Sequence, residues 1–294
     1  MICLIDNEHE NIWNVQLFVL LHSSLQVAGK SKNGIIKEGK LMNYYIITGT
    51  SRGIGEALAK SIIEPGNTLF AVSRTMNEDL VEYASALNVP VFYHEADLSK
   101  RNEAELFISS VFEKINFTAN DKIALINNAG MLEPVAPVKS IDFELTEKHL
   151  SLNLLAPFIL SSVFLVRTAA LAIPKVILNI SSGASSHPFS GWSVYCSSKA
   201  GVDMLTKAAG LEQSAEQHPA TIFALAPGII ETGMQQLIRN TDEGLFPDRN
   251  MFIQLYEEGK LAKVDDVAQI IMQSIFSPAI ETGSVLTIEQ LKEI

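Results

Sequence analysis

The sequence contains only two cysteines, Cys3 and Cys196. Two distant cysteines match neither the disulfide framework of a small secreted protein nor a paired-thiolate zinc site. No metal site is expected either, because ligand spacing is missing among the histidines, which are His9, His22, His94, His149, His187 and His218. The composition therefore favours a reducing compartment, and we expect a cytoplasmic protein.

Basic side chains are also scarce: 22 Lys and Arg stand against 33 Asp and Glu, which gives a formal net charge of −11. Surfaces that bind nucleic acid or anionic lipid need clustered Lys and Arg. The segment considered as a membrane span or signal peptide, Ile12 to Ala28, is interrupted by polar side chains and preceded by Asp6, Glu8 and Glu10. Neither nucleic acid nor a membrane is an expected partner.

The first 41 residues differ from the rest of the chain. They carry equal numbers of lysines and acidic residues, so the whole net charge of −11 lies in residues 42–294. Lys37-Glu38-Gly39 can also be encoded by a purine-rich ribosome-binding sequence shortly before the Met42 codon. We expect residues 1–41 to be an extension outside the fold, with Met42 as a candidate native start. A disordered leader and an amphipathic helix on the domain are the alternatives, and residues 42–294 are expected to form one domain.

From Met42 onward, apolar runs rich in β-branched residues alternate with stretches of helical periodicity. This alternation is typical of a parallel sheet that helices cover on both faces. The seven expected strands are Tyr44–Thr48, Thr68–Ser73, Val89–His94, Lys122–Asn127, Lys175–Ser181, Thr221–Ala226 and Ser284–Ile288. The main expected helices are Ile54–Ile63, Glu103–Ile115, Glu147–Ala172, Tyr195–Ala215 and Val264–Phe276. The sequence predicts an α/β fold with a long loop at Glu243–Asn250, where such folds carry substrate lids.

A glycine-rich turn, Thr48–Gly55, joins the first expected strand to a helix. Glycines permit a tight turn and a close approach to a pyrophosphate, which the free N–H groups of the helix N-terminus stabilise. Turns of this kind also occur as plain strand-to-helix connections. As a dinucleotide site, the turn would use Gly49, Ser51, Arg52, Gly53, Ile54 and Gly55.

The end of the second expected strand indicates which dinucleotide would bind. NAD-binding folds carry Asp or Glu there to accept from the ribose 2′-OH, whereas this sequence has Ser73-Arg74. Arg74 offers a planar, permanently charged group to a 2′-phosphate, and Arg52 adds a second cation. NADP(H) is the expected cofactor, and two solvated arginines without a role are the alternative. Asp97-Leu98, after the third strand, is expected to contact the adenine, although Asp there is also an ordinary turn former.

Tyr195 and Lys199 lie four residues apart at the start of an expected helix, so both project from one face. The ordinary pKa of tyrosine, about 10, makes it a poor acid or base near neutrality, and a nearby ammonium lowers that pKa. Ser182 ends the fifth strand, where its hydroxyl can donate to a substrate carbonyl oxygen during hydride transfer, while Ser181 faces the other way. The expected catalytic residues are therefore Tyr195, Lys199 and Ser182. Tyr195 and Lys199 are also expected to contact the cofactor, where Lys199 can hold the nicotinamide ribose.

Five motifs, in this order, resemble those of the short-chain dehydrogenase/reductase family: Thr48–Gly55, Asn127-Asn128-Ala129-Gly130, Ser182, Tyr195-x-x-x-Lys199 and Pro227-Gly228-x-x-x-Thr232. The resemblance covers Met42 to the C-terminus and implies a Rossmann fold with strand order 3-2-1-4-5-6-7. It implies that the adenosine side is closed by Asn128, Ala129 and Gly130. It implies that the nicotinamide side is formed by Pro227, Gly228, Ile230 and Thr232. It also implies that Asn153 links Lys199 to solvent through water.

Within the family, several stretches look most like bacterial benzil reductases of the (S)-benzoin-forming kind: Ile46–Ser51, Asn153–Pro157, Asn179–Gly183, Gly191–Cys196 and Phe223–Gly228. Sepiapterin reductases are a second match, but that group anchors its pterin with an acidic side chain near the last strand, where we place Thr287. The resemblance therefore implies NADPH-dependent reduction of an aromatic or hydrophobic diketone to the hydroxyketone. A 3-oxoacyl reductase, which needs a basic surface for its acidic carrier protein, and an NADP(H)-binding sensor or scaffold are the alternatives.

The expected substrate pocket lies around Tyr195 and uses His187, Phe189, Trp192 and Met234, with loop packing as the alternative role of the first three. Leu237, Phe246 and Tyr256 are expected to complete the lid wall. The expected helix Glu147–Ala172 is apolar around much of its circumference, which is more than one core-facing stripe requires. We therefore expect a homodimer or homotetramer assembled through this helix and Tyr195–Ala215.

Overall fold

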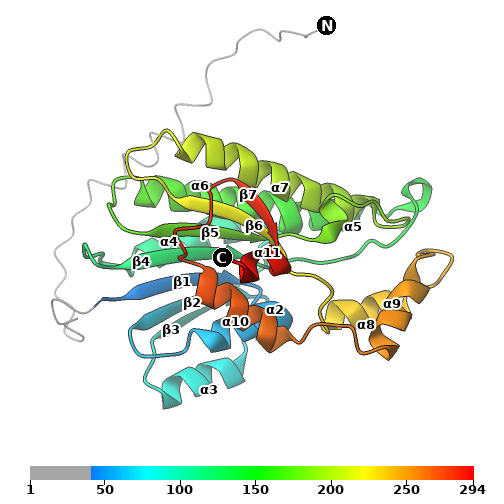
Figure 1. Ribbon diagram of the computed structural model, residues 1–294, viewed down its shortest axis with the longest axis horizontal. Helices are drawn as coiled ribbons and strands as arrows, with labels where there is room; N and C mark the ends of the chain where they lie inside the picture. The colour runs from blue at the N-terminus through cyan, green and yellow to red at the C-terminus, as the bar shows by residue number, and fades with distance from the viewer. Residues whose placement is uncertain (1–40) are drawn as a thin grey trace, which may run out of the picture. The chain divides into compact units, whose positions relative to one another are not determined.

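Within residues 41–294, the part of the chain that the computed structural model describes, seven parallel strands form one sheet in the order β3-β2-β1-β4-β5-β6-β7 (Figure 1). The strands are β1 Asn43–Thr48, β2 Asn67–Ser73, β3 Val91–Glu95, β4 Lys122–Asn127, β5 Lys175–Ile180, β6 Thr221–Ala226 and β7 Ser284–Thr287. The order reverses between β1 and β4, which is where doubly wound sheets open a crevice at the carboxyl ends of the strands. The predicted Rossmann fold and strand order are confirmed.

The described chain starts at the edge of the predicted domain. Met42 is already tied to the sheet, because its N–H donates to Asp121 Oδ1 at 3.1 Å and its carbonyl accepts from Lys122 N–H at 3.1 Å. Residues 41–294 form one unit. Apart from Leu41, the predicted extension 1–41 lies outside the described residues.

Side chains alternate between the two faces of the sheet and so divide the core into two layers. In β1, Tyr44 and Ile46 point to one layer, and Tyr45 and Ile47 point to the other. The layer around Tyr45 is covered by α2 Gly53–Ser61, α3 Glu78–Ala86, α10 Val264–Ser274 and α11 Ile288–Lys292. The layer around Tyr44 is covered by α4 Arg101–Phe112, α6 Ala156–Thr168 and α7 Ser193–Gln213. Both faces of the sheet are therefore buried, as the apolar strands predicted.

The helix predicted at Glu147–Ala172 starts earlier and is not regular. It begins with α5 Phe143–Leu150, where the side chain of Asp142 accepts from Leu145 N–H at 2.9 Å. A π-helical turn, Ser151–Leu155, then connects α5 to α6. Pro157 explains the wider turn, because it has no amide hydrogen to give to the carbonyl of Asn153 four residues earlier. The irregular turn therefore falls at a predicted site residue.

The continuous helical stretch Phe143–Thr168 is long and apolar enough, by length and composition alone, to cross a membrane. The sequence interpretation had considered only Ile12 to Ala28 for that role. In the fold, this stretch is a layer helix: its α6 part packs on α4, and Leu160 and Phe164 are buried in the core. Its opposite side carries exposed apolar residues, namely Leu150, Leu155, Phe158 and Val166.

Two helices that the sequence did not predict, α8 Gly233–Asn240 and α9 Arg249–Glu257, stand apart from the two helical layers (Figure 1). The segment between them contains most of the predicted loop Glu243–Asn250, whose last residues already belong to α9. Ile238 and Phe252 from these helices join Trp192 and Tyr195 in a third apolar cluster. These helices therefore cover the end of the sheet where Tyr195 lies.

Candidate active site

A cavity of about 840 Å³ opens at the carboxyl ends of the strands. Most of the predicted site residues line it. The predicted cofactor residues on its wall are Gly49, Ser51, Arg52, Gly53, Ile54, Ser73, Arg74, Asp97, Leu98, Asn128, Ala129, Gly130, Pro227, Gly228, Ile230 and Thr232. The predicted catalytic and substrate residues there are Ser182, Tyr195, Lys199, His187, Phe189, Trp192 and Met234. Gly55 and Asn153 are not part of this wall, and both lie directly behind it.

Gly55 fits beneath the glycine-rich turn. A Cβ atom at this position would lie 2.2 Å from the carbonyl oxygen of Gly49, which no side chain tolerates. Gly49 and Gly53 have φ angles of 75° and 63°, in the left-handed region that favours glycine. Gly49 and Gly53 therefore shape the cavity wall, whereas Gly55 lets the first turn of α2 approach β1.

Thr48, at the end of β1, connects the glycine-rich turn to the loop after β4. Its Oγ1 accepts hydrogen bonds from the backbone N–H groups of Asn128 and Ala129, both at 2.9 Å. The Asn128 side chain returns a bond, since Nδ2 donates to Thr48 O at 2.8 Å. Thr48 stands inside the predicted motif but was not assigned a role. It fixes the two loops that form the middle of the cavity.

Both predicted arginines, Arg52 and Arg74, line the cavity at the end where the adenosine is predicted to bind, called here the adenosine end. Burial raises the pKa of Asp97, but hydrogen bonds from Ser99 and the positive charges of Lys148 and Arg74 outweigh it and hold that pKa below its ordinary value. Asp97 is therefore an anion that accepts from Ser99 Oγ at 2.7 Å. Its contact with a bound adenine stays a prediction.

Ser73, at the end of β2, has its hydroxyl engaged within the protein. Ser73 Oγ donates to Thr75 O at 2.7 Å and also contacts the Tyr93 hydroxyl. Tyr93 OH in turn accepts from Thr50 Oγ1 at 3.0 Å. These contacts link the Ser73 loop to the glycine-rich turn, so Ser73 shapes the adenosine end as well as lining it.

Tyr195 and Lys199 project from the same face of α7 and are nearly buried, with exposed fractions of 7% and 6%. Lys199 Nζ lies 5.8 Å from the centre of the Tyr195 ring and donates to Ile180 O at 2.7 Å. Burial lowers the pKa of Lys199 to about 8, although the Asp203 carboxylate acts in the opposite direction. The ammonium is therefore held by the Ile180 carbonyl close to the phenol, and the Asp203 carboxylate acts on it only as a nearby charge.

The expected lowering of the Tyr195 pKa is wrong for this site. Burial raises the pKa of Tyr195 above 10.0, and the Ser182 hydroxyl offsets only part of that rise. The sequence shows the nearby cation of Lys199 but not the depth at which the phenol is buried. Tyr195 is consequently a neutral phenol near neutral pH, which is the form that donates a proton.

The two adjacent serines have different hydrogen-bond partners, but both line the cavity, contrary to the expectation that only Ser182 reaches the site. Ser181 Oγ donates to Asp203 Oδ1 at 2.5 Å, so this hydroxyl faces the α7 side and is used there. Ser182 Oγ accepts from Ala184 N–H at 3.2 Å at the start of the turn after β5. Asp203 was not predicted as a site residue. Its position four residues after Lys199, on the same face of the helix, could have indicated that its charge acts on Lys199.

Asn153 lies in the π-helical turn behind Gly130 and Met131. Its Oδ1 accepts from Met131 N–H at 2.9 Å, and its Nδ2 donates to Met131 O at 2.8 Å and to His149 Nε2 at 3.0 Å. The Asn153 side chain is thus hydrogen-bonded to the loop after β4, on the side of that loop away from the cavity. The water link from Asn153 to Lys199 that the resemblance implies stays a prediction.

The substrate end of the cavity is aromatic. Phe189 and Trp192 have ring centres 4.9 Å apart, and Trp192 stacks on Phe246 at 4.5 Å with an interplanar angle of 2°. Phe246 and Tyr256 do not line the cavity, contrary to expectation. Phe246 is fully buried against Trp192, and the Tyr256 ring lies under the Arg239 guanidinium at 3.9 Å. Unpredicted wall residues include Met131, Leu132, Gln235, Met251 and Phe252. The cavity wall next to Tyr195 is therefore rich in aromatic and apolar side chains.

The region after β7 also departs from expectation. Thr287 begins α11, where its Oγ1 accepts from Gln290 N–H and the Gln290 side chain accepts from Thr287 N–H. Two residues later, Glu289 lines the cavity. The prediction that Thr287 stands where an acidic side chain could act therefore missed a carboxylate close by.

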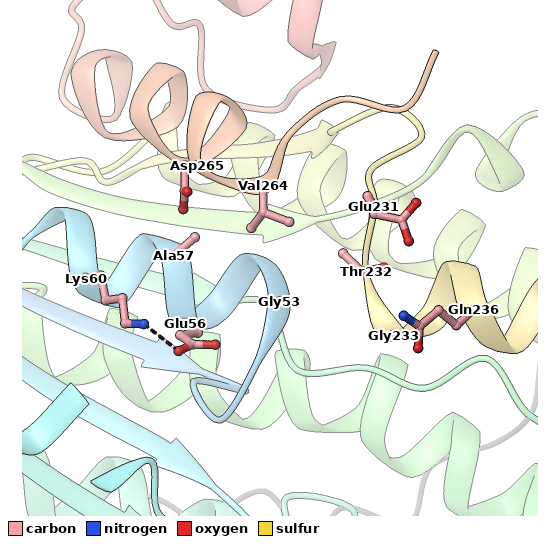
Figure 2. A pocket seen from close by; sticks show the side chains of 10 residues that line it. All are labelled: Gly53, Glu56, Ala57, Lys60, Glu231, Thr232, Gly233, Gln236, Val264 and Asp265. Carbon is pink, nitrogen blue, oxygen red and sulfur yellow. Dashed lines mark hydrogen bonds and ion pairs between the residues drawn. The ribbon is translucent and has the colours of Figure 1, made fainter. Parts of the chain in front are cut away.

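A second, smaller cavity of about 360 Å³ adjoins the glycine-rich turn and shares Gly53, Thr232 and Gly233 with the first. Figure 2 shows the Glu56–Lys60 ion pair on α2, at 2.7 Å, with Glu231 and Gln236 on the opposite side. Between Leu41 and Ile294, no three His, Cys, Asp or Glu side chains are arranged to hold a metal ion. The smaller cavity therefore adjoins the larger one at the glycine-rich turn.

Known proteins share this arrangement. The family model described as short chain dehydrogenase matches residues 43–243. A benzil reductase ((S)-benzoin forming) of Bacillus cereus is 37% identical over 249 residues, 85% of this chain and 100% of the relative, and a sepiapterin reductase of Rattus norvegicus is 29% identical over 252 residues, 81% and 93%. The crystal structure of the KRED1-Pglu enzyme has a TM-score of 0.73 at 26% identity and covers 83% of this chain and 100% of its own. The chain belongs to the short-chain dehydrogenase/reductase family, as its motifs predicted.

Proposed function

We propose that the chain is an NADPH-dependent carbonyl reductase that converts an aromatic or hydrophobic diketone of the benzil kind into the hydroxyketone. The observation that carries this proposal is one continuous cavity with two arginines at one end and Tyr195, Ser182 and Lys199 beside an aromatic wall at the other. The similarity to a benzil reductase over the whole length of that relative supports the same substrate class.

The residues at the adenosine end fit NADPH. The end of β2 reads Ser73-Arg74 and offers no carboxylate to a ribose 2′-OH. Arg74 and Arg52 supply two permanent positive charges for a 2′-phosphate. The first turn of α2 supplies N–H groups for a pyrophosphate, and the positive φ angles of Gly49 and Gly53 form the turn in front of it.

The catalytic steps assigned to the chain are proton transfer and charge stabilisation. Bound NADPH supplies the hydride. Ser182 donates a hydrogen bond to the carbonyl oxygen on which negative charge develops, and Tyr195 delivers a proton to that oxygen. The raised pKa of Tyr195 keeps this proton in place until the oxygen becomes basic. Lys199 and Asn153 restore the Tyr195 proton from solvent.

The aromatic wall supports a flat, hydrophobic substrate. Phe189, Trp192 and Phe252 present ring surface near Tyr195, and apolar burial is the term that favours an aryl group there. The test is NADPH oxidation against a panel of benzil, shorter α-diketones, sepiapterin and a 3-oxoacyl thioester. We expect the highest kcat/KM with benzil. A panel in which the acyl thioester or sepiapterin is preferred contradicts the proposed substrate.

Glu289 favours a second candidate, a pterin reductase of the sepiapterin type. Its carboxylate lies on the cavity wall after the last strand, where it can accept hydrogen bonds from a pterin ring. The similarity to a rat sepiapterin reductase supports the same substrate class. Glu289→Gln distinguishes the two functions, because it should weaken turnover of a pterin and leave benzil reduction unchanged.

Two further alternatives receive less support. A 3-oxoacyl reductase needs a basic docking surface, and the net charge of −11 opposes an acidic carrier protein. A sensor or scaffold that binds NADP(H) without turnover has no use for Tyr195, Lys199 and Ser182 in one site. We place the enzyme in the cytoplasm, as a homodimer or homotetramer whose subunits cover the exposed apolar side of α5, α6 and α7.

A further inference from the structure

His149 is a fully buried histidine of α5 that joins three parts of the site. Its Nδ1 atom lies 2.7 Å from the carbonyl oxygen of Glu133, and its Nε2 atom lies 3.0 Å from both Asn153 Nδ2 and Ser198 Oγ. Glu133 lines the cavity, and Ser198 immediately precedes Lys199 on α7. One imidazole therefore contacts the cavity wall, the π-helical turn and the catalytic helix.

The partners of His149 determine which of its ring nitrogens carries the proton. The carbonyl of Glu133 can only accept, so Nδ1 carries the proton and Nε2 is an acceptor. The Ser198 hydroxyl donates to a backbone carbonyl of α7 at 2.8 Å, so the hydrogen directed at Nε2 comes from Asn153. The remaining amide atoms of Asn153 are paired with the backbone of Met131. Neutral His149 thus completes the contacts that fix the Asn153 amide.

We propose that His149 is a positioning residue that holds the cavity wall Met131–Glu133 in register with Tyr195 and Lys199, acting through its hydrogen bonds to Glu133 and Asn153 and its packing contact with Ser198. The His149 ring also packs edge-on against the Tyr195 ring, with centres 6.0 Å apart at 85°. The expected effect of His149 on turnover rests on the proposed carbonyl reduction. Its expected effect on the order of the cavity wall Met131–Glu133 does not depend on that function.

The charges around His149 agree with a neutral ring. Burial lowers its pKa, the hydrogen bond to Glu133 O partly offsets this, and the Lys199 ammonium lowers it further. The Glu133 carboxylate acts in the raising direction, and Tyr195, the other titratable group against the ring, is a neutral phenol. A protonated ring would direct a hydrogen from Nε2 at the amide nitrogen of Asn153, where two donors would face each other.

The test compares two variants that each keep half of the imidazole chemistry. His149→Gln keeps an acceptor near the Nε2 position for Asn153, whereas His149→Asn keeps only a donor near the Nδ1 position for Glu133. We expect kcat for benzil reduction to be at least about tenfold lower in His149→Asn than in His149→Gln. The Kd for NADPH should stay within about threefold of the wild-type value in both, because neither variant alters the adenosine end.

A second readout does not require turnover. The Met131 N–H donates to Asn153 Oδ1, so its hydrogen exchange should be at least about tenfold faster in His149→Asn than in His149→Gln. Thr168→Val is a matched control, since it removes a buried hydroxyl bonded to Phe164 O in α6 at a distance from the site. It should change neither kcat nor Met131 exchange.

Equal Met131 exchange in the two histidine variants overturns the proposal, and so does equal kcat in an active enzyme. If the wild-type chain reduces none of the dicarbonyl compounds, the proposed function fails. The exchange rates alone then decide whether His149 orders the wall.

Discussion

Asp203 lies one turn of α7 beyond Lys199, and its negative charge opposes the loss of the Lys199 proton that burial favours. The balance sets the pKa of Lys199 at about 8, below its ordinary value of 10.5. A base with a lowered pKa loses its charge at a lower pH. The charge that Lys199 contributes to reduction is therefore lost as the pH rises through about 8.

We accordingly predict that kcat/KM for carbonyl reduction declines above about pH 8, because this parameter reports groups of the free enzyme. Asp203→Asn removes the carboxylate that raises the Lys199 pKa, so the decline should move to lower pH. The measurement is a pH profile of both proteins with the same substrate. A profile whose midpoint is unchanged in Asp203→Asn would show that another group controls the decline.

Tyr195→Phe should retain NADPH binding and lose turnover by about 10²–10⁴. The substitution keeps the ring that packs against Trp192 and His149 and removes only the hydroxyl that delivers the proton. Lys199→Met should weaken both steps, because it removes the ammonium expected to hold the nicotinamide ribose as well as the charge beside Tyr195. NADPH fluorescence titration and single-turnover rates separate the two steps. Near wild-type reduction by Tyr195→Phe would refute the assigned proton donor.

The adjacent serines should separate turnover from stability. Ser182→Ala is expected to lower kcat more than Ser181→Ala, because only Ser182 is assigned to the carbonyl oxygen. Ser181→Ala leaves the buried Asp203 carboxylate without its donor, which should lower the free energy of unfolding by about 1–3 kcal/mol. Urea unfolding and steady-state kinetics of both variants make the comparison. The reverse order of kcat losses would exchange the two roles.

Cofactor preference is expected to depend on Arg74. NADPH should be preferred over NADH at least about tenfold, since a hydrogen bond to a charged group contributes about 1.5–3 kcal/mol. Arg74→Asp replaces the cation with a carboxylate suited to the ribose 2′-OH and should move the preference toward NADH. Arg101→Asp is the matched control, because Arg101 pairs with Glu105 on α4 and does not line the cavity. Equal efficiency of wild type with both cofactors would contradict the assignment.

The exposed apolar side of α6 should be covered by a second subunit. Phe158 is 45% exposed there, and we expect light scattering to give the mass of a dimer or tetramer at micromolar concentration. Phe158→Glu should reduce that mass. Leu106→Glu on α4, at a site that is 68% exposed, is the control that should not. A monomeric wild-type protein would refute the expected assembly.

The ends of the strands could be predicted to within about two residues, because short apolar runs rich in β-branched residues are typical of buried strands. The helices α3, α8 and α9 were missed because each is short and presents few residues to a core: only Leu80 and Ala84 are buried in α3, and only Phe252 in α9. Local periodicity is then too weak to separate helix from loop. Tertiary contact, not pattern, stabilises these elements.

The candidate site could be predicted where its residues form local motifs, as at Gly49–Gly55 and Tyr195–Lys199. His149 could not, because its partners Glu133 and Ser198 lie 16 and 49 residues away and its own surroundings resemble an ordinary helix. The predicted direction of the Tyr195 pKa shift was wrong for a similar reason. Burial depends on parts of the chain that no local spacing reveals.

The aromatic wall has a consequence for how such enzymes diversify. Its rings, Phe189, Trp192 and Phe252, belong with the buried Phe246 to a cluster that shares no residue with the two clusters that flank the sheet in residues 41–294. Substitutions in the wall can therefore alter which acyl or aryl group enters while the sheet keeps its own packing. Mutations in α8 and α9 can then accumulate without destabilising the sheet. A new substrate preference therefore does not require a prior increase in the stability of the protein.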